Sequence, residues 1–120
     1  MRLNSMYVSA KDFDRAQEWY KEILFQCQPD SRTDRFVFWK LGEVLFGVFN
    51  PDVAEADVAF GDNCVPNMEV EEVDSLHDRL SDNDVSIVMP LNNVNGTRIF
   101  QCQDSEGNVL EFYQWIEEQK

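Results

Sequence analysis

The sequence predicts an α+β fold built from two βαβββ modules, and three observations support it. A strand-like segment followed by an amphipathic helix covers residues 3–25, and the same pattern returns from Asn67 onward. Apolar segments typical of strands follow each helix. At 120 residues the chain is long enough for one domain. We therefore expect a single domain over 1–120, with module one at about 1–58 and module two at about 59–120.

The first module begins with a strand and a helix. Met6 and Val8 alternate with more polar neighbours, which is the period of a strand covered on one side. Asp12 is placed to cap the helix that follows, because its carboxylate can accept from the N–H groups of the first turn. The spacing of apolar residues then predicts one buried helix face, formed by Phe13, Ala16, Tyr20, Ile23 and Leu24.

Two further strands complete module one. Phe36–Leu41 and Val44–Phe49 are rich in apolar and aromatic residues, and Gly42-Glu43 between them has the composition of a tight turn. A shorter strand at Phe25–Gln28 is also predicted. Residues 50–62 join the two modules.

The second module repeats this order. Met68 and Val70 alternate with polar residues, and Asp74 or Ser75 can cap the helix that follows. Val85–Val88 predicts a strand, and the turn-rich segment Asn92–Gly96 predicts a mobile loop. The apolar face of the predicted helix consists of Val73, Leu76 and Leu80.

A strand, a tight turn and a returning strand end the second module. Asp104–Asn108 has turn composition and is flanked by apolar segments. The returning strand places the carboxylate of Glu111 among Val109, Leu110 and Phe112. A carboxylate inside an apolar strand is costly unless it meets a metal, a cation or a hydrogen-bond donor. Glu111 is therefore the first candidate for a functional residue.

Composition limits the classes of function. The formal net charge of −13 disfavours nucleic acid and anionic membranes as partners and attracts cations. No apolar stretch has the length of a membrane span, and the first residues lack the apolar core of a signal peptide, so we expect a cytoplasmic protein. The three cysteines are widely spaced. We expect Cys27, Cys64 and Cys102 to be reduced and buried rather than paired or bound to zinc.

These motifs, in this order, resemble the vicinal oxygen chelate superfamily, which includes glyoxalases, bleomycin-resistance proteins and extradiol dioxygenases. Residues 12–25 resemble its first helix. Asp104–Phe112 resembles its turn-strand motif, with Ser105-Glu106 where Pro-Asp is common. The resemblance covers nearly the whole chain and implies curled mixed sheets that enclose a cavity.

The resemblance also implies where a metal would bind. Metal-dependent members place ligands on the first and last strands of each module. Those four places fall here on Ser5, Phe46, Val65 (Cys64 if the register shifts by one) and Glu111. Of Ser5, Phe46, Val65 and Glu111, only Glu111 has a side chain of the kind that coordinates such a metal. The comparison implies the bleomycin-resistance-like, metal-free branch, without a cofactor. His77, the one histidine, is expected to be a surface or half-buried helix residue.

The predicted function is metal-independent binding of a small aromatic or cationic molecule by a homodimer, with antibiotic sequestration as one form of it. Strand alternation from these anchors directs Val44, Phe46 and Val48 of one strand inward. Aromatic rings would stack on the ligand while carboxylates supply counter-charge. The predicted ligand-binding residues are Ser5, Tyr7, Trp39, Phe46, Asn67, Glu69, Glu111 and Tyr113.

Several alternatives stay open. Glu111 is also the candidate for a general base or a metal ligand in a glyoxalase-like lyase or isomerase, or in a dioxygenase-type enzyme. A structural ion pair of Glu111 with Arg98 or Arg35 would remove it from function. Any one of the aromatic residues would also suit a plain core, and an acidic surface that docks a basic protein is a third class.

Overall fold

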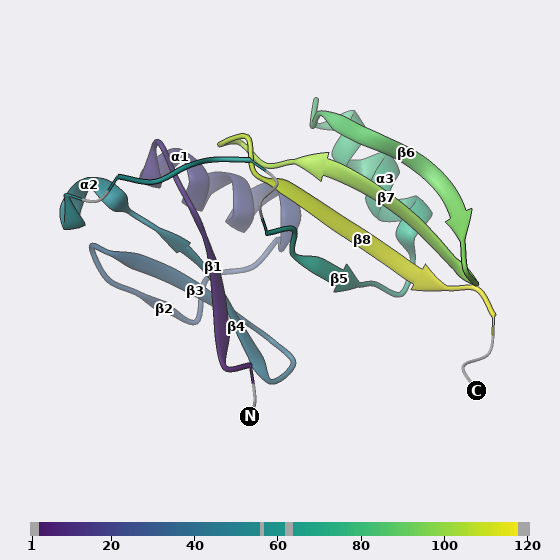
Figure 1. Ribbon diagram of the computed structural model, residues 1–120, viewed down its shortest axis with the longest axis horizontal. Coiled ribbons are helices and arrows are strands. Elements are labelled where there is room, and N and C mark those ends of the chain that lie inside the picture. The colour runs from purple at the N-terminus through teal and green to yellow at the C-terminus, as the bar shows by residue number, and fades with distance from the viewer. Residues whose placement is uncertain (1–2, 56, 62–63, 118–120) are drawn as a thin grey trace. The chain divides into compact units, whose positions relative to one another are not determined.

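The computed structural model describes residues 3–55, 57–61 and 64–117. The chain divides into two compact units, residues 1–60 and residues 61–120. Each unit contains one mixed four-stranded sheet in βαβββ order, so the predicted fold class is confirmed. Figure 1 shows the elements along the chain. Among the described residues, no helix combines the length and hydropathy that a bilayer crossing requires.

Unit 1 starts with β1 (Ser5–Ser9), α1 (Phe13–Glu18) and a π-helical continuation, η1 (Trp19–Leu24). Asp12 caps α1 as predicted, because its Oδ1 accepts from the backbone N–H of Arg15 at 3.0 Å. The predicted apolar helix face is confirmed, with Ala16, Tyr20 and Leu24 buried. The π-helical geometry was not predicted. Trp19, the first residue of η1, is buried as well.

The remaining strands of unit 1 are β2 (Ser31–Arg32), β3 (Phe36–Leu41) and β4 (Val44–Phe49), and a short helix, α2 (Pro51–Ala54), follows them. The strand order is β1-β4-β3-β2, with β1 parallel to β4. The predicted strands β3 and β4 are confirmed, and each begins and ends at the predicted residues. The predicted strand at Phe25–Gln28 is wrong, because Phe25 closes η1 with an N–H bond to the Tyr20 carbonyl.

Unit 2 has the strand order β5-β8-β7-β6, formed by β5 (Asn67–Glu69), β6 (Ile87–Val94), β7 (Thr97–Gln103) and β8 (Val109–Trp115). Its helix, α3 (Val73–Asp82), buries Val73, Leu76 and Leu80 as predicted. The predicted capping residues are wrong, because the helix starts one residue before Asp74. Its first N–H instead donates to Oε1 of Gln114 on β8 at 3.0 Å.

The predicted mobile loop at Asn92–Gly96 is also wrong, because β6 continues through Val94. Only Asn95-Gly96 forms the turn into β7, and both residues have positive φ, 50° and 78°. Such a two-residue Asn-Gly turn matches the twist of the two strands that it joins. The turn between β7 and β8 lies at Asp104–Asn108 as predicted. Asp104 holds it, because its Oδ1 accepts from the N–H groups of Glu106 and Asn108 at 2.8 and 2.9 Å.

The cysteines differ in their surroundings. All are free thiols, as predicted, but Cys27 and Cys64 are exposed rather than buried. Both lie in irregular segments outside the sheets. Cys102 is buried on β7, and burial followed by the charge of Asp104 raises the pKa of its thiol to about 12.

Candidate functional site

In each unit the sheet has one face covered by the unit's helix and one face opposite the helix. Paired residues on neighbouring strands share a face. In unit 2, β8 lies between β5 and β7 (Figure 1) and supplies the central residues of both faces. We call the side opposite α3 the carboxylate face, defined by Asn67, Glu69, Gln101, Glu111 and Tyr113.

Glu111 lies at the centre of the carboxylate face. Its two strand neighbours are Asn67 on β5 and Gln101 on β7. Asn67 donates its side-chain N–H to Oε1 at 2.6 Å, and Gln101 donates to Oε2 at 2.7 Å. Each carboxylate oxygen therefore has one amide donor and keeps further acceptor capacity. The sheet holds this half-buried carboxylate in one orientation.

A second polar group lies one residue pair along the same strands. Glu69 on β5 is paired with Tyr113 on β8, and the phenol donates to Oε1 of Glu69 at 3.2 Å. Burial, and then the hydrogen bond to Glu69, raises the pKa of the Tyr113 phenol. The Tyr113 ring also meets Trp115 edge to face at 5.7 Å between centroids. An aromatic pair thus adjoins the two carboxylates.

The ion-pair interpretation of Glu111 through Arg98 is wrong. Arg98 lies on the helix-covered face of β7, and its Nε donates to both oxygens of Asp74 on α3 at 2.9 and 3.0 Å. Hydrogen bonding between the two groups lowers the pKa of Asp74 and raises that of Arg98. Alternation along β7 keeps Arg98 and Gln101 on opposite faces. The amide donors of Glu111 take the place of the predicted cation.

In unit 1, Ser5 and Tyr7 lie on the face opposite the helix, as predicted. Tyr7 is 54% exposed. Phe46 does not share that face. It is 1% exposed and packs beneath η1, with its ring 5.3 Å from Tyr20. Trp39, its partner on β3, is buried beside it and lines a pocket on the helix side. Phe46 is therefore corrected from the predicted ligand face to the helix side of the sheet. The facing of Trp39, a predicted ligand-binding residue, was left open by the sequence, and it too lies on the helix side.

This correction has a simple cause in the turns. The two-residue turn of unit 1 pairs Val44 with Leu41, whereas the five-residue turn of unit 2 pairs Val109 with Gln103. Phe46 follows Gly42 by four residues, as Glu111 follows Gly107, and this equal spacing from the turn glycine is why Phe46 was matched with Glu111. Because the turns differ in length, the match assigned β4 to the wrong face, since a shift of one residue moves every side chain to the other face. Val44 and Val48 lie on the helix side with Phe46 for the same reason.

Apart from Tyr7, the aromatic residues opposite the helix in unit 1 were missed. They form what we call the aromatic face, defined by Tyr7, Phe36, Phe38 and Phe49. Phe36 lies 5.2 Å from Tyr7 and is stacked on Phe38 at 5.2 Å between centroids. Gly47 provides the room, because a Cβ there would overlap the Phe38 ring. The alternation of Phe36 and Phe38 with buried Val37 and Trp39 was the available signal.

The chemistry of the side chains around Glu111 does not fit a catalytic metal centre. Such a centre needs about three protein ligands, usually His, Cys or carboxylate groups. Within the described ranges, no three His, Cys, Asp or Glu side chains gather closely enough to hold one ion. Asn67 and Gln101 turn N–H groups toward Glu111. Val65 precedes β5, so that Asn67 rather than Val65 pairs with Glu111, and exposed Cys64 lies further back.

His77 is a half-buried residue of α3, as expected. Its ring packs edge to face on Phe100 at 5.2 Å, and Nδ1 lies 3.1 Å from Oδ1 of Asp78. Phe100 belongs to the helix-covered face of the unit 2 sheet. His77 is thus placed away from the carboxylate face.

Comparisons with known proteins support the fold of the chain and show a family resemblance in the sequence of unit 2. Residues 67–112 match the sequence profile of the Glyoxalase/Bleomycin resistance protein/Dioxygenase superfamily. The solved lactoylglutathione lyase from Agrobacterium tumefaciens is 19% identical, with a TM-score of 0.75, over 94% of this chain and 92% of that one. TioX from Micromonospora sp. ML1 is 24% identical, with a TM-score of 0.71, over 96% and 99%. A search of curated protein sequences gave no match.

The matched segment runs from β5 into β8, so it contains the strands that carry Asn67, Gln101 and Glu111. The solved structures share the fold along nearly the whole chain. Residues 67–112 of this protein thus resemble the glyoxalase, bleomycin resistance protein and dioxygenase superfamily in sequence, and the chain shares the fold of solved structures that include a lactoylglutathione lyase.

Proposed function

We propose that this protein binds a small, flat, cationic molecule on the carboxylate face, without a metal ion and without converting it. The observation that supports this proposal is the state of Glu111. Its carboxylate is half-buried and is oriented by two neutral amide donors rather than neutralised by a cation. A hydrogen bond that includes a charged group is stronger than one between neutral groups. A cationic ligand would therefore gain the most binding free energy by contacting Glu111.

The groups beside Glu111 suit the rest of such a ligand. Tyr113 and Trp115 present aromatic surface next to the carboxylates, and Trp115 is 41% exposed. Aromatic rings attract cations over their faces and stack on flat molecules. Glu69 adds a second negative charge on the same face. A cationic aromatic antibiotic has this chemistry, so sequestration of such a compound is the physiological form that we propose.

Proflavine, a flat cationic dye, is a suitable probe, and neutral acridone is its matched control. We expect saturable proflavine binding that shifts the Trp115 indole N–H signal in NMR spectra. Glu111→Gln should weaken binding by about 1.5–3 kcal/mol, the worth of a hydrogen bond to a charged group. Asn67 or Gln101 can turn its amide oxygen toward the new amide, so the variant should keep its fold.

Glu43→Gln is the matched control variant, because Glu43 lies in the β3–β4 turn and its substitution changes the net charge equally. Equal losses of proflavine affinity in the two variants would show that net charge alone attracts the dye, and would contradict a site at Glu111. Binding should be insensitive to a chelator, and proflavine should be recovered unchanged. The homodimer that the resemblance implies is part of the proposal, and light scattering tests it.

The lactoylglutathione lyase among the structural neighbours motivates the enzymatic alternative. Protein stripped with a chelator and then supplied with Ni²⁺ or Zn²⁺ should form no lactoylglutathione, because amide N–H groups rather than ligands surround Glu111. Metal-dependent turnover that Glu111→Gln abolishes would overturn the proposed binder and favour the lyase.

A further inference from the structure

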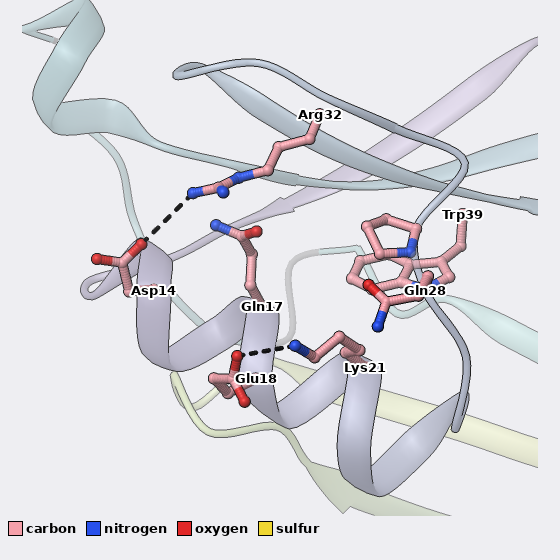
Figure 2. A pocket seen from close by; sticks show the side chains of 8 residues that line it. Asp14, Gln17, Glu18, Lys21, Gln28, Arg32 and Trp39 are labelled. Carbon is pink, nitrogen blue, oxygen red and sulfur yellow. Dashed lines mark hydrogen bonds and ion pairs between the residues drawn. The ribbon is translucent and has the colours of Figure 1, made fainter.

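Unit 1 contains a pocket of about 270 Å³ on the helix side of its sheet. Helix α1 and η1 form one wall, and the segment that leads into β2 forms the other (Figure 2). The apolar part of its lining is Pro29 and the edge of Trp39, and polar side chains line the rest. None of the residues of the carboxylate face lines this pocket. It is therefore a second place where a small molecule could bind.

Gln17 on α1 has an unused hydrogen-bond donor in this pocket. Its Nε2 is buried and has no acceptor among the described residues. A buried donor without a partner costs about 1–3 kcal/mol. Figure 2 shows the Gln17 side chain extending from the helix toward Arg32. A ligand with an acceptor oxygen would remove this cost on binding.

Arg32 on β2 provides a second set of donors. Its guanidinium lies 3.7 Å from Oδ1 of Asp14, which is an ion pair but exceeds the length of a hydrogen bond. Lys21, the other cation of the pocket, is already bonded to Glu18 at 3.0 Å, and this bond raises the pKa of Lys21. Arg32 is therefore the cation that keeps donors for a ligand, and its planar fork matches a carboxylate.

The local charge permits an anion here. The chain carries −13, which repels anions over most of its surface. In the pocket, however, Lys21 and Arg32 balance Asp14 and Glu18. The carboxylate of a ligand bound here meets no net negative charge from the lining. The apolar body of the same ligand can lie against Pro29 and Trp39.

We infer that this pocket binds a small carboxylic acid with an apolar body, with the carboxylate held by Arg32 and Gln17. The inference is independent of the proposed site on unit 2, which takes the opposite charge. Benzoate is a suitable probe, and benzamide, which has the same shape without the charge, is its control.

The full chain is titrated with each compound while the indole signals of its three tryptophans are followed by NMR. Trp39 reports on the pocket, because its Nε1 donates to the Cys27 carbonyl at 3.1 Å beside it. We expect benzoate to shift the Trp39 indole and the Gln17 amide signals with a Kd on the order of 1 mM. Benzamide should bind at least about tenfold more weakly. Trp115 should not respond to benzoate.

Arg32→Gln should weaken benzoate binding about tenfold or more. Arg35→Gln, an exposed arginine in the same segment that does not line the pocket, should leave it unchanged. Gln17→Met should also weaken binding, yet raise the melting temperature of the free protein, because it removes a buried donor without a partner. Absence of a Trp39 response, equal binding of benzamide, or equal effects of the two arginine substitutions would each overturn the inference.

Discussion

The two units share one topology, yet the faces opposite their helices have contrasting chemistry. On the central strand β4 of unit 1, this face presents Leu45, Gly47 and Phe49, next to the rings of Phe36 and Phe38. On the central strand β8 of unit 2, it presents Val109, Glu111 and Tyr113, next to amide and carboxylate side chains. The strand order sets which positions face away from the helix. The residues at those positions then decide whether the face stacks rings or holds charge.

The largest expected effect tests the facing of β4 directly. Phe46→Glu would place an unpaired carboxylate beneath η1, where Phe46 is 1% exposed. This substitution should lower the free energy of unfolding by at least about 4 kcal/mol, because it combines the loss of a large buried side chain with the burial of a charge. Urea unfolding followed by circular dichroism measures this cost.

Leu45→Glu, one residue earlier and on the opposite face, is the matched control. We expect it to cost less than half as much, because Leu45 is only half-buried. Equal destabilisation by the two variants would contradict the assignment of faces and restore Phe46 to the predicted ligand side.

A smaller effect is expected at Gly47, which the aromatic face requires. Gly47→Ala should destabilise the protein by about 1–3 kcal/mol, the usual cost of overpacking, because the new Cβ overlaps the Phe38 ring. Adding Phe38→Ala should recover part of the loss. A double-mutant cycle measures this coupling. If the changes in unfolding free energy of the two substitutions simply add, the packing of the Phe38 ring does not require a glycine at position 47.

On the helix side of unit 2, the Asp74–Arg98 pair should make stability depend on pH. Because Arg98 lowers the pKa of Asp74, the native state binds a proton less readily than the unfolded chain. This contribution is therefore present above the ordinary aspartate pKa of about 3.9, and it is lost as the pH falls through the lower native value. Asp74→Asn should flatten the acid limb of a plot of urea midpoint against pH, whereas Asp82→Asn at the other end of α3 should not.

The smallest expected effect concerns Tyr113 on the carboxylate face. Burial raises its pKa most, and the hydrogen bond and charge of Glu69 contribute next. Glu69→Gln should therefore return the Tyr113 pKa only part of the way to its ordinary value, as followed by NMR titration of the ring protons. Glu71→Gln makes the same charge change two residues away, and an equal shift in that variant would contradict a direct bond from Tyr113 to Glu69.

Local pattern was sufficient for most of the fold. Apolar segments separated by turn residues located β3, β4, β7 and β8. The spacing of Ala16, Tyr20 and Leu24 located the first helix, because this period follows from the face that a helix buries. The same reasoning missed the length of β6 and the cap of α3. Residues distant in sequence determine both features: β7 continues the pairing of β6, and Gln114 bonds the first N–H of α3.

The candidate site was predictable in unit 2 and less so in unit 1. The sequence alone determined that Asn67 shares a face with Glu69 and that Glu111 shares a face with Tyr113, because alternation along a strand is a local property. The family resemblance placed the two pairs on one side of the sheet, and the register of β5 and β8 confirms this. Only the tertiary structure decided what Glu111 meets. Its partners come from strands on either side, and the pairing register makes them amides rather than an arginine. Register likewise decided that Phe46 would lie under the helix, because the length of a turn can move every side chain of the next strand to the other face.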